Sequence, residues 1–214
     1  MPIQSLHHVA YRCKDAQETV DFYTQVMGLE FSMAMAEDRV PSTREESPYM
    51  HVFFKMADGS HVAFFEIPES PPMGRDTNTP EWVQHLALKV EDEAALLDYK
   101  ARAEARGLKV IGPVDHTIFR SIYFHDPSGH RLELTTDVGQ PEQLAELAKA
   151  RDPMMQEWNK TKRPPRQAAW VLSDDERPPM WLSSDLEVFE GEALPEVRAQ
   201  YAAVSGMTST QLAE

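Results

Sequence analysis

Two histidines and one carboxylate occupy positions that could hold a metal ion. His8 opens the segment H-V-A-Y-R-C-K-D, and His85 opens H-L-A-L-K-V-E-D, which follows the same pattern. Side chains alternate along a strand, so each histidine shares a face with the alanine two residues on, Ala10 or Ala87. Equivalent positions of a repeat come together in space, and Glu133 adds a carboxylate from a later strand. Two imidazoles and one carboxylate are the ligand set of non-haem Fe(II) oxygenases.

Two neighbours compete with these residues or extend the set. His7 stands beside His8, but only His8 matches His85 in the repeat. Glu66 ends the last strand expected in the first copy, H-V-A-F-F-E, and is the candidate for a fourth metal ligand. With Glu66 included, the ion would hold two histidines and two glutamates and would keep fewer open positions.

A β-hairpin is predicted around the sequence D-P-S-G at residues 126–129. Strand-like runs rich in Ile, Tyr, Phe, Leu and Thr flank this turn on both sides. Pro127 suits the second position of a type I turn, and Gly129 suits the left-handed residue that follows. A three-residue loop of this kind pairs Asp126 with His130.

This register places a phenol and a carboxylate on one face of the hairpin. Counting outward from the turn, Tyr123 lies opposite Glu133, and His116 stands a few residues upstream. Side chains directly opposite each other on one face lie about 5 Å apart. The alternative interpretation is a surface hairpin in which Glu133 only forms a salt bridge.

The chain contains the same plan twice. Each copy begins with a strand and continues into a helix-like segment, which ends at a Gly-Leu pair with Gly28 or Gly107 as the expected cap. Each copy then closes with a hairpin. We therefore predict an α+β fold of two β-α-β-β-β modules, residues 1–70 and 81–137, forming a cupped mixed sheet around a metal site.

Residues 138–214 belong to neither copy and are predicted to form a helical and extended arm. We expect a helix over residues 141–150 and a second one that starts at Asp152-Pro153, because Pro is tolerated at the first helical position. Trp170 and Trp181 recur among prolines, which makes the segment too apolar for a disordered tail. The arm either covers the core of its own chain or wraps a second subunit.

Charge and composition exclude several classes of partner. The net charge of −14 argues against nucleic acid and anionic membranes. The single cysteine, Cys13, excludes a disulfide framework and fits a reducing compartment. We see neither a signal peptide nor an apolar run of roughly 18 residues, so we expect a cytoplasmic protein.

The repeat, with His8, His85 and Glu133 in place, resembles the vicinal oxygen chelate superfamily of glyoxalases, bleomycin resistance proteins and extradiol dioxygenases. The resemblance covers about residues 4–137. Eight residues are similar in order and spacing to the extradiol ring-cleavage signature: Val114, His116, Ile122, Tyr123, Asp126, Pro127, Gly129 and Glu133. This resemblance implies that Glu133 is a metal ligand and that His116 and Tyr123 orient the substrate and stabilise the bound oxygen.

The resemblance implies an Fe(II)-dependent extradiol-type dioxygenase that acts on a catechol-like aromatic, with His116 and Tyr123 as its catalytic residues. A histidine with a pKa of about 6.5 suits the acid that such a reaction needs. The alternative is a glyoxalase I-type lyase or isomerase that uses Ni, Zn or Co, with Glu66 as a ligand; Mn is a further alternative metal. A third is a metal-free small-molecule binding protein. We expect a homodimer or higher homo-oligomer.

Extradiol enzymes resemble each other in a further acid–base histidine before the second metal histidine. The nearest candidates are His51 and His61. If the first hairpin turns as the second does, Glu66 pairs with Met50, and both histidines point away from the face that carries Glu66.

Overall fold

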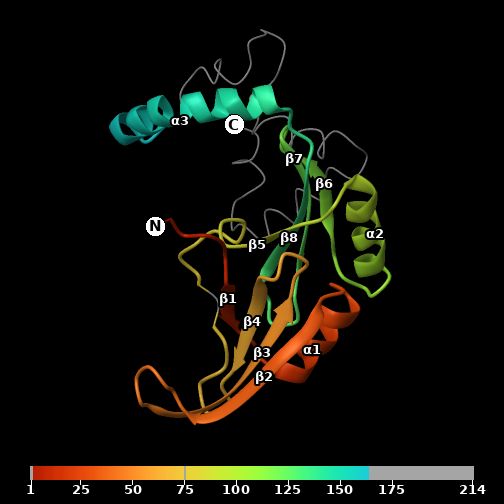
Figure 1. The fold of residues 1–214 in the computed structure, drawn as a ribbon, viewed down its shortest axis with the longest axis vertical. Coiled ribbons are helices and arrows are strands. Elements are labelled where there is room, and N and C mark those ends of the chain that lie inside the picture. The colour runs from red at the N-terminus through yellow and green to blue at the C-terminus, as the bar shows by residue number, and fades with distance from the viewer. Residues whose placement is uncertain (1, 75, 164–214) are drawn as a thin grey trace. The chain divides into compact units, whose positions relative to one another are not determined.

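The computed structural model describes residues 2–74 and 76–163, and within them the strands form two four-stranded mixed sheets (Figure 1). The first sheet has the strand order β1-β4-β3-β2 and the second β5-β8-β7-β6. The identical order confirms the predicted repeat and the α+β class. The strands are β1 His8–Arg12, β2 Glu30–Arg39, β3 Glu46–Lys55, β4 His61–Glu66, β5 Leu86–Lys89, β6 Ile111–Asp115, β7 Phe119–His125 and β8 Arg131–Asp137.

Two compact units make up the chain. The first comprises Met1–Leu86, Tyr99–Lys109 and Phe124–Leu132, and the second comprises Ala87–Asp98, Val110–Tyr123 and Glu133–Glu214. Each unit therefore combines segments that are distant in sequence. The module boundaries inferred from the repeat stay a prediction.

The first sheet has the register that its turn predicts. Met50 pairs with Glu66, and His51 pairs with Phe65, between the antiparallel strands β3 and β4. At the turn, the Met56 amide donates to the Ser60 carbonyl at 2.9 Å. The turn at residues 126–129 closes in the same way, with the Asp126 amide donating to the His130 carbonyl at 3.0 Å. Glycines of positive φ, 86° at residue 59 and 91° at residue 129, explain why both hairpins share this geometry.

Helix α1, Ala16–Gln25, covers one face of the first sheet. Asp15 caps it by accepting a hydrogen bond from the Glu18 amide at 2.7 Å. The ring of Tyr23 stacks on Phe54 with 5.0 Å between centroids, and both side chains are fully buried. The alternating apolar residues of β3 and β4 on this face therefore belong to the core.

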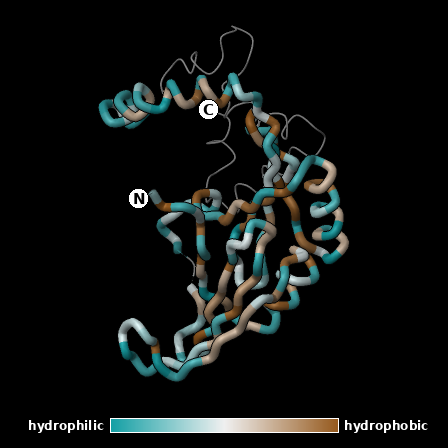
Figure 2. The backbone as a smooth tube through the Cα atoms, viewed as in Figure 1, coloured by the Kyte–Doolittle hydropathy of each residue, from teal (hydrophilic) through white to brown (hydrophobic). Residues whose placement is uncertain are grey.

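Helix α2, Glu93–Glu104, and helix α1 stop before glycines of positive φ, 79° at residue 107 and 70° at residue 28, as predicted. Helix α3, Pro141–Thr161, is continuous, so the predicted new helix at Asp152-Pro153 is wrong. Proline removes only one backbone donor, and the helix continues through Pro153. Hydrophilic and hydrophobic residues alternate along α3 (Figure 2).

The arm beyond residue 163 lies outside the described residues, and so do the expectations for Trp170 and Trp181. Of the helices in residues 2–74 and 76–163, none is both long and apolar enough to cross a lipid bilayer.

Candidate active site

Three of the predicted site residues form one hydrogen-bonded chain in the second unit. The Nε2 atom of His116 lies 2.8 Å from the hydroxyl oxygen of Tyr123. That hydroxyl donates to Oε1 of Glu133 at 3.0 Å. Tyr123 is 9% exposed and Glu133 is 4% exposed, so water is largely kept from both groups. The predicted meeting of a phenol and a carboxylate on one face is confirmed.

The direction of the hydrogen bonds defines where the protons sit. Tyr123 has a single hydroxyl proton, and it is directed to Glu133. His116 must therefore donate its Nε2 proton to the Tyr123 oxygen. The chain thus holds one proton on His116 and one on Tyr123.

Ser121 is a member of this chain that the sequence reasoning missed. Its hydroxyl donates to the same Oε1 atom of Glu133 at 2.5 Å and lies 3.1 Å from the Thr135 hydroxyl. Ser121 is fully buried. Its spacing of two residues from Tyr123 on a strand was the available signal, because residues two apart on a strand share a face.

Strand alternation explains why these polar groups converge. Ile122 on β7 and Leu134 on β8 are fully buried core residues. Burying them on one side of the sheet turns the intervening residues Ser121, Tyr123 and Glu133 to the other side. The polar chain is thus a direct consequence of how the two strands bury their apolar residues.

His8 occupies the first position of β1 in the first unit. It is exposed, and its Nδ1 lies 2.7 Å from Nδ1 of His7. The register of β1 with β4 places His8 beside His61 on the face opposite α1. The predicted face of His8 within the first sheet is confirmed.

His51 lies close to His8 on that face, with 6.5 Å between the ring centroids. The side chain is 8% exposed, and its ring stacks on Phe65 with 3.5 Å between the ring centroids. Among the described residues, the Nε2 atom of His51 has no hydrogen-bond partner. The pKa of His51 is lowered to about 4, mainly because the ring is buried and to a smaller extent because of the electrostatic effect of His8. His51 is therefore neutral at pH 7.

Glu66 does not lie with His8. Its Oε2 accepts a hydrogen bond from the Ala16 amide at 2.8 Å, at the first turn of α1. A carboxylate is favourable there because the first amides of a helix lack partners and carry a partial positive charge. The Glu66 carboxylate thus lies at the N-terminus of α1, on the face of the sheet opposite His8, and its role as a possible fourth metal ligand stays a prediction.

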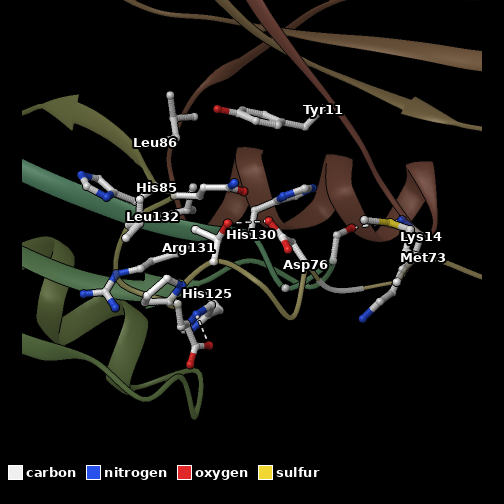
Figure 3. A pocket seen from close by; sticks show the side chains of 18 of the residues that line it. Tyr11, Lys14, Met73, Asp76, His85, Leu86, His125, His130, Arg131 and Leu132 are labelled. Carbon is white, nitrogen blue, oxygen red and sulfur yellow. Dashed lines mark hydrogen bonds and ion pairs between the residues drawn. The ribbon is translucent and has the colours of Figure 1, made fainter. Parts of the chain in front are cut away.

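His85 lines a cavity of about 840 Å³ within the first unit (Figure 3). Tyr11 and His130 also line it, with 5.0 Å between their ring centroids. His130 Nε2 lies 2.6 Å from the Arg12 carbonyl, which fixes that ring against β1. The cavity combines aromatic, basic and acidic side chains.

The predicted metal ligands are His8, His85 and Glu133. Within residues 2–74 and 76–163, no three His, Cys, Asp or Glu side chains lie close enough together to hold a metal ion. The three residues do carry the right chemistry, two imidazoles and a carboxylate, for a divalent transition metal. Their convergence on one ion stays a prediction.

The sequence of residues 5–134 matches the model of the Glyoxalase/Bleomycin resistance protein/Dioxygenase superfamily. The chain therefore belongs to this superfamily, and the resemblance inferred from its motifs is confirmed. Members of this superfamily are commonly enzymes that act on small molecules, and they include dioxygenases and lyases.

Two curated relatives and one solved structure illustrate its range. The chain is 31% identical over 141 residues to the "Putative ring-cleaving dioxygenase MhqA" of Bacillus subtilis (strain 168), covering 64% of this chain but only 42% of that protein. It is 28% identical over 144 residues to a 2-epi-5-epi-valiolone epimerase of Actinomyces sp, covering 61% of this chain and 78% of that protein. A superfamily domain from Frankia sp. EAN1pec shares the fold with a TM-score of 0.54 and 15% identity, covering 64% of this chain and 99% of that domain.

Proposed function

We propose that this protein is an Fe(II)-dependent extradiol-type ring-cleavage dioxygenase that acts on a catechol-like aromatic. The observation that carries the proposal is the chain from His116 through Tyr123 to Glu133, at 2.8 and 3.0 Å. It places two proton-carrying groups beside the carboxylate expected to bind the metal. The similarity to MhqA, whose name describes ring cleavage, supports the same activity.

His8, His85 and Glu133 would hold the metal ion in this proposal. Bound there, the ion would act as a Lewis acid on the two oxygens of the substrate and would support oxygen chemistry. Ser121 and Tyr123 both donate to Oε1 of Glu133, which holds the carboxylate in one orientation. Donors of this kind commonly fix metal ligands in place.

His116 and Tyr123 would donate and accept protons during the reaction. The binding of a catechol through both oxygens requires loss of a proton, and ring cleavage requires a proton donor later. In the buried chain, one proton resides on His116 Nε2 and one on the Tyr123 hydroxyl. General acid–base groups of this type contribute about 10²–10⁴ in rate.

The lyase alternative has less support. It assigns Glu66 to the metal as the group that moves the proton, and Glu66 instead accepts a hydrogen bond from the Ala16 amide. The epimerase relative shows that other reactions occur among proteins similar to this chain, so the assay must separate them.

Oxygen uptake by anaerobically Fe(II)-loaded protein, measured across a panel of catechols, tests the proposal. We expect His85→Ala to lose iron, and Tyr123→Phe to keep its iron while losing about 10²–10⁴ in turnover. Glu66→Gln is the matched control and should retain both iron and activity. A Glu66→Gln protein without iron or activity, beside a fully active Tyr123→Phe protein, would refute the dioxygenase assignment.

A further inference from the structure

The turn that carries His116 has an unusual backbone. Thr117 has a φ of 72°, and the Ile118 amide donates to the His116 carbonyl at 2.8 Å across it. A hydrogen bond between residues two apart around a centre of positive φ is a γ-turn of the rare, strained kind. For a β-branched residue such as threonine this φ is a true outlier.

Asp115 holds this turn from the β6 side. Its Oδ1 accepts a hydrogen bond from the Thr117 amide at 2.7 Å. The His116 amide donates to the Phe119 carbonyl at 2.9 Å and closes the hairpin on the other side. The Asp115 contact fixes the residue that carries the strain, so it resists the return of Thr117 to a negative φ.

Gly139 holds the turn from outside. Its amide and that of Val138 both donate to the Ile118 carbonyl, at 2.8 and 3.0 Å. A Cβ atom at Gly139 would lie 2.8 Å from the Cβ of Ile118, closer than side chains allow. The lack of a side chain at residue 139 therefore permits this approach.

These contacts fix the orientation of His116, one of the site residues. The His116 ring packs on Phe119 with 4.7 Å between centroids, and its Nε2 lies 2.8 Å from the Tyr123 hydroxyl. Strained residues persist only where the surroundings over-determine them, and they cluster at functional sites. We propose that Asp115 is a positioning residue that directs His116 onto Tyr123 by holding the γ-turn at Thr117. The proposal rests on the catalytic role of His116 proposed above.

A rescue experiment tests this idea without requiring turnover. Nitrogen NMR of the His116 ring reports whether Nε2 carries the proton, as its bond to Tyr123 requires. In Asp115→Ala, Thr117 should relax and the ring signals should move toward a mixture of both tautomers. Adding Thr117→Gly should restore the wild-type signals, because glycine adopts positive φ at no steric cost. A merely structural loss at Asp115 would not be rescued by glycine.

Two controls separate the hydrogen bond from the charge. Asp115→Asn keeps an acceptor oxygen and should retain the wild-type signals. Arg120→Gln removes the ion pair to Asp115, 3.3 Å in the structure, and should also leave His116 unchanged. Where Asp115→Ala does not fold, Gly139→Ala displaces the same turn through Ile118 and should mix the tautomers.

Wild-type signals in Asp115→Ala would overturn the proposal, and so would mixed tautomers that Thr117→Gly fails to restore. In the catechol assay, Asp115→Ala should lower kcat by about 10- to 100-fold and change KM little, as expected for a misplaced catalytic group. A wild-type protein that consumes no oxygen would refute the proposed function, while the NMR result would still decide the role of Asp115.

Discussion

Replacing Tyr123 by phenylalanine removes the central link of the polar chain. The hydroxyl donates to Glu133 Oε1 at 3.0 Å and lies 2.8 Å from His116 Nε2. Ser121 still donates to the same carboxylate oxygen at 2.5 Å, so Glu133 keeps one strong donor. A hydrogen bond to a charged group contributes about 1.5–3 kcal/mol, and we expect the free energy of unfolding to fall by that amount. At about 2–4 °C per kcal/mol for a chain of this size, Tm should fall by roughly 3–12 °C.

Thermal and urea unfolding of the metal-free protein measure this loss. Tyr49→Phe is the matched control, because the Tyr49 ring packs on Phe65 while its hydroxyl has no hydrogen-bond partner among the described residues. The control should change the free energy of unfolding by less than about 0.5 kcal/mol. Equal stability of Tyr123→Phe and wild type would show that the buried chain contributes nothing, and the reasoning from its distances would fail.

Three further predictions concern the core and its titratable groups. The pKa of His51 is lowered from 6.5 to about 4, so the unfolded state binds this proton first as the pH falls. The metal-free protein should therefore lose stability between about pH 6.5 and 4. In His51→Gln, the urea midpoint of unfolding should change less with pH in that window. The Tyr23 hydroxyl and the His130 amide donate to the Asp126 carboxylate at 3.2 and 2.8 Å, so Asp126→Ala leaves both donors without this acceptor. The free energy of unfolding, measured in urea, should fall by about 1–3 kcal/mol, and an unchanged value would contradict this prediction. Phe54→Ala should cost about 3–5 kcal/mol in the same assay, and a smaller loss would show that this core collapses around the cavity.

The sequence predicts the fold to a large extent because the deciding signals are local. Both hairpins have a glycine at the same turn position. In the first hairpin this turn fixes the pairing of Met50 with Glu66. In the second hairpin it explains why Tyr123 lies beside Glu133. A one-residue slip would move every buried side chain to the wrong face, so the apolar pattern permits only one register. The helix through Pro153 shows the limit of local rules, since one missing donor did not end it.

Only the tertiary structure decided the surroundings of several other polar residues. Glu66 and Ala16 are 50 residues apart, and their contact exists because α1 packs on the face that Glu66 occupies. The cavity beside His85 likewise draws its lining from segments far apart in sequence. The γ-turn at Thr117 runs against the preference of threonine and is fixed by Asp115 and Gly139. Spacing and turn chemistry therefore determined the strands, their faces and the meeting of Tyr123 with Glu133, whereas contacts between distant segments decided the surroundings of Glu66 and His85, because packing overrides local preference.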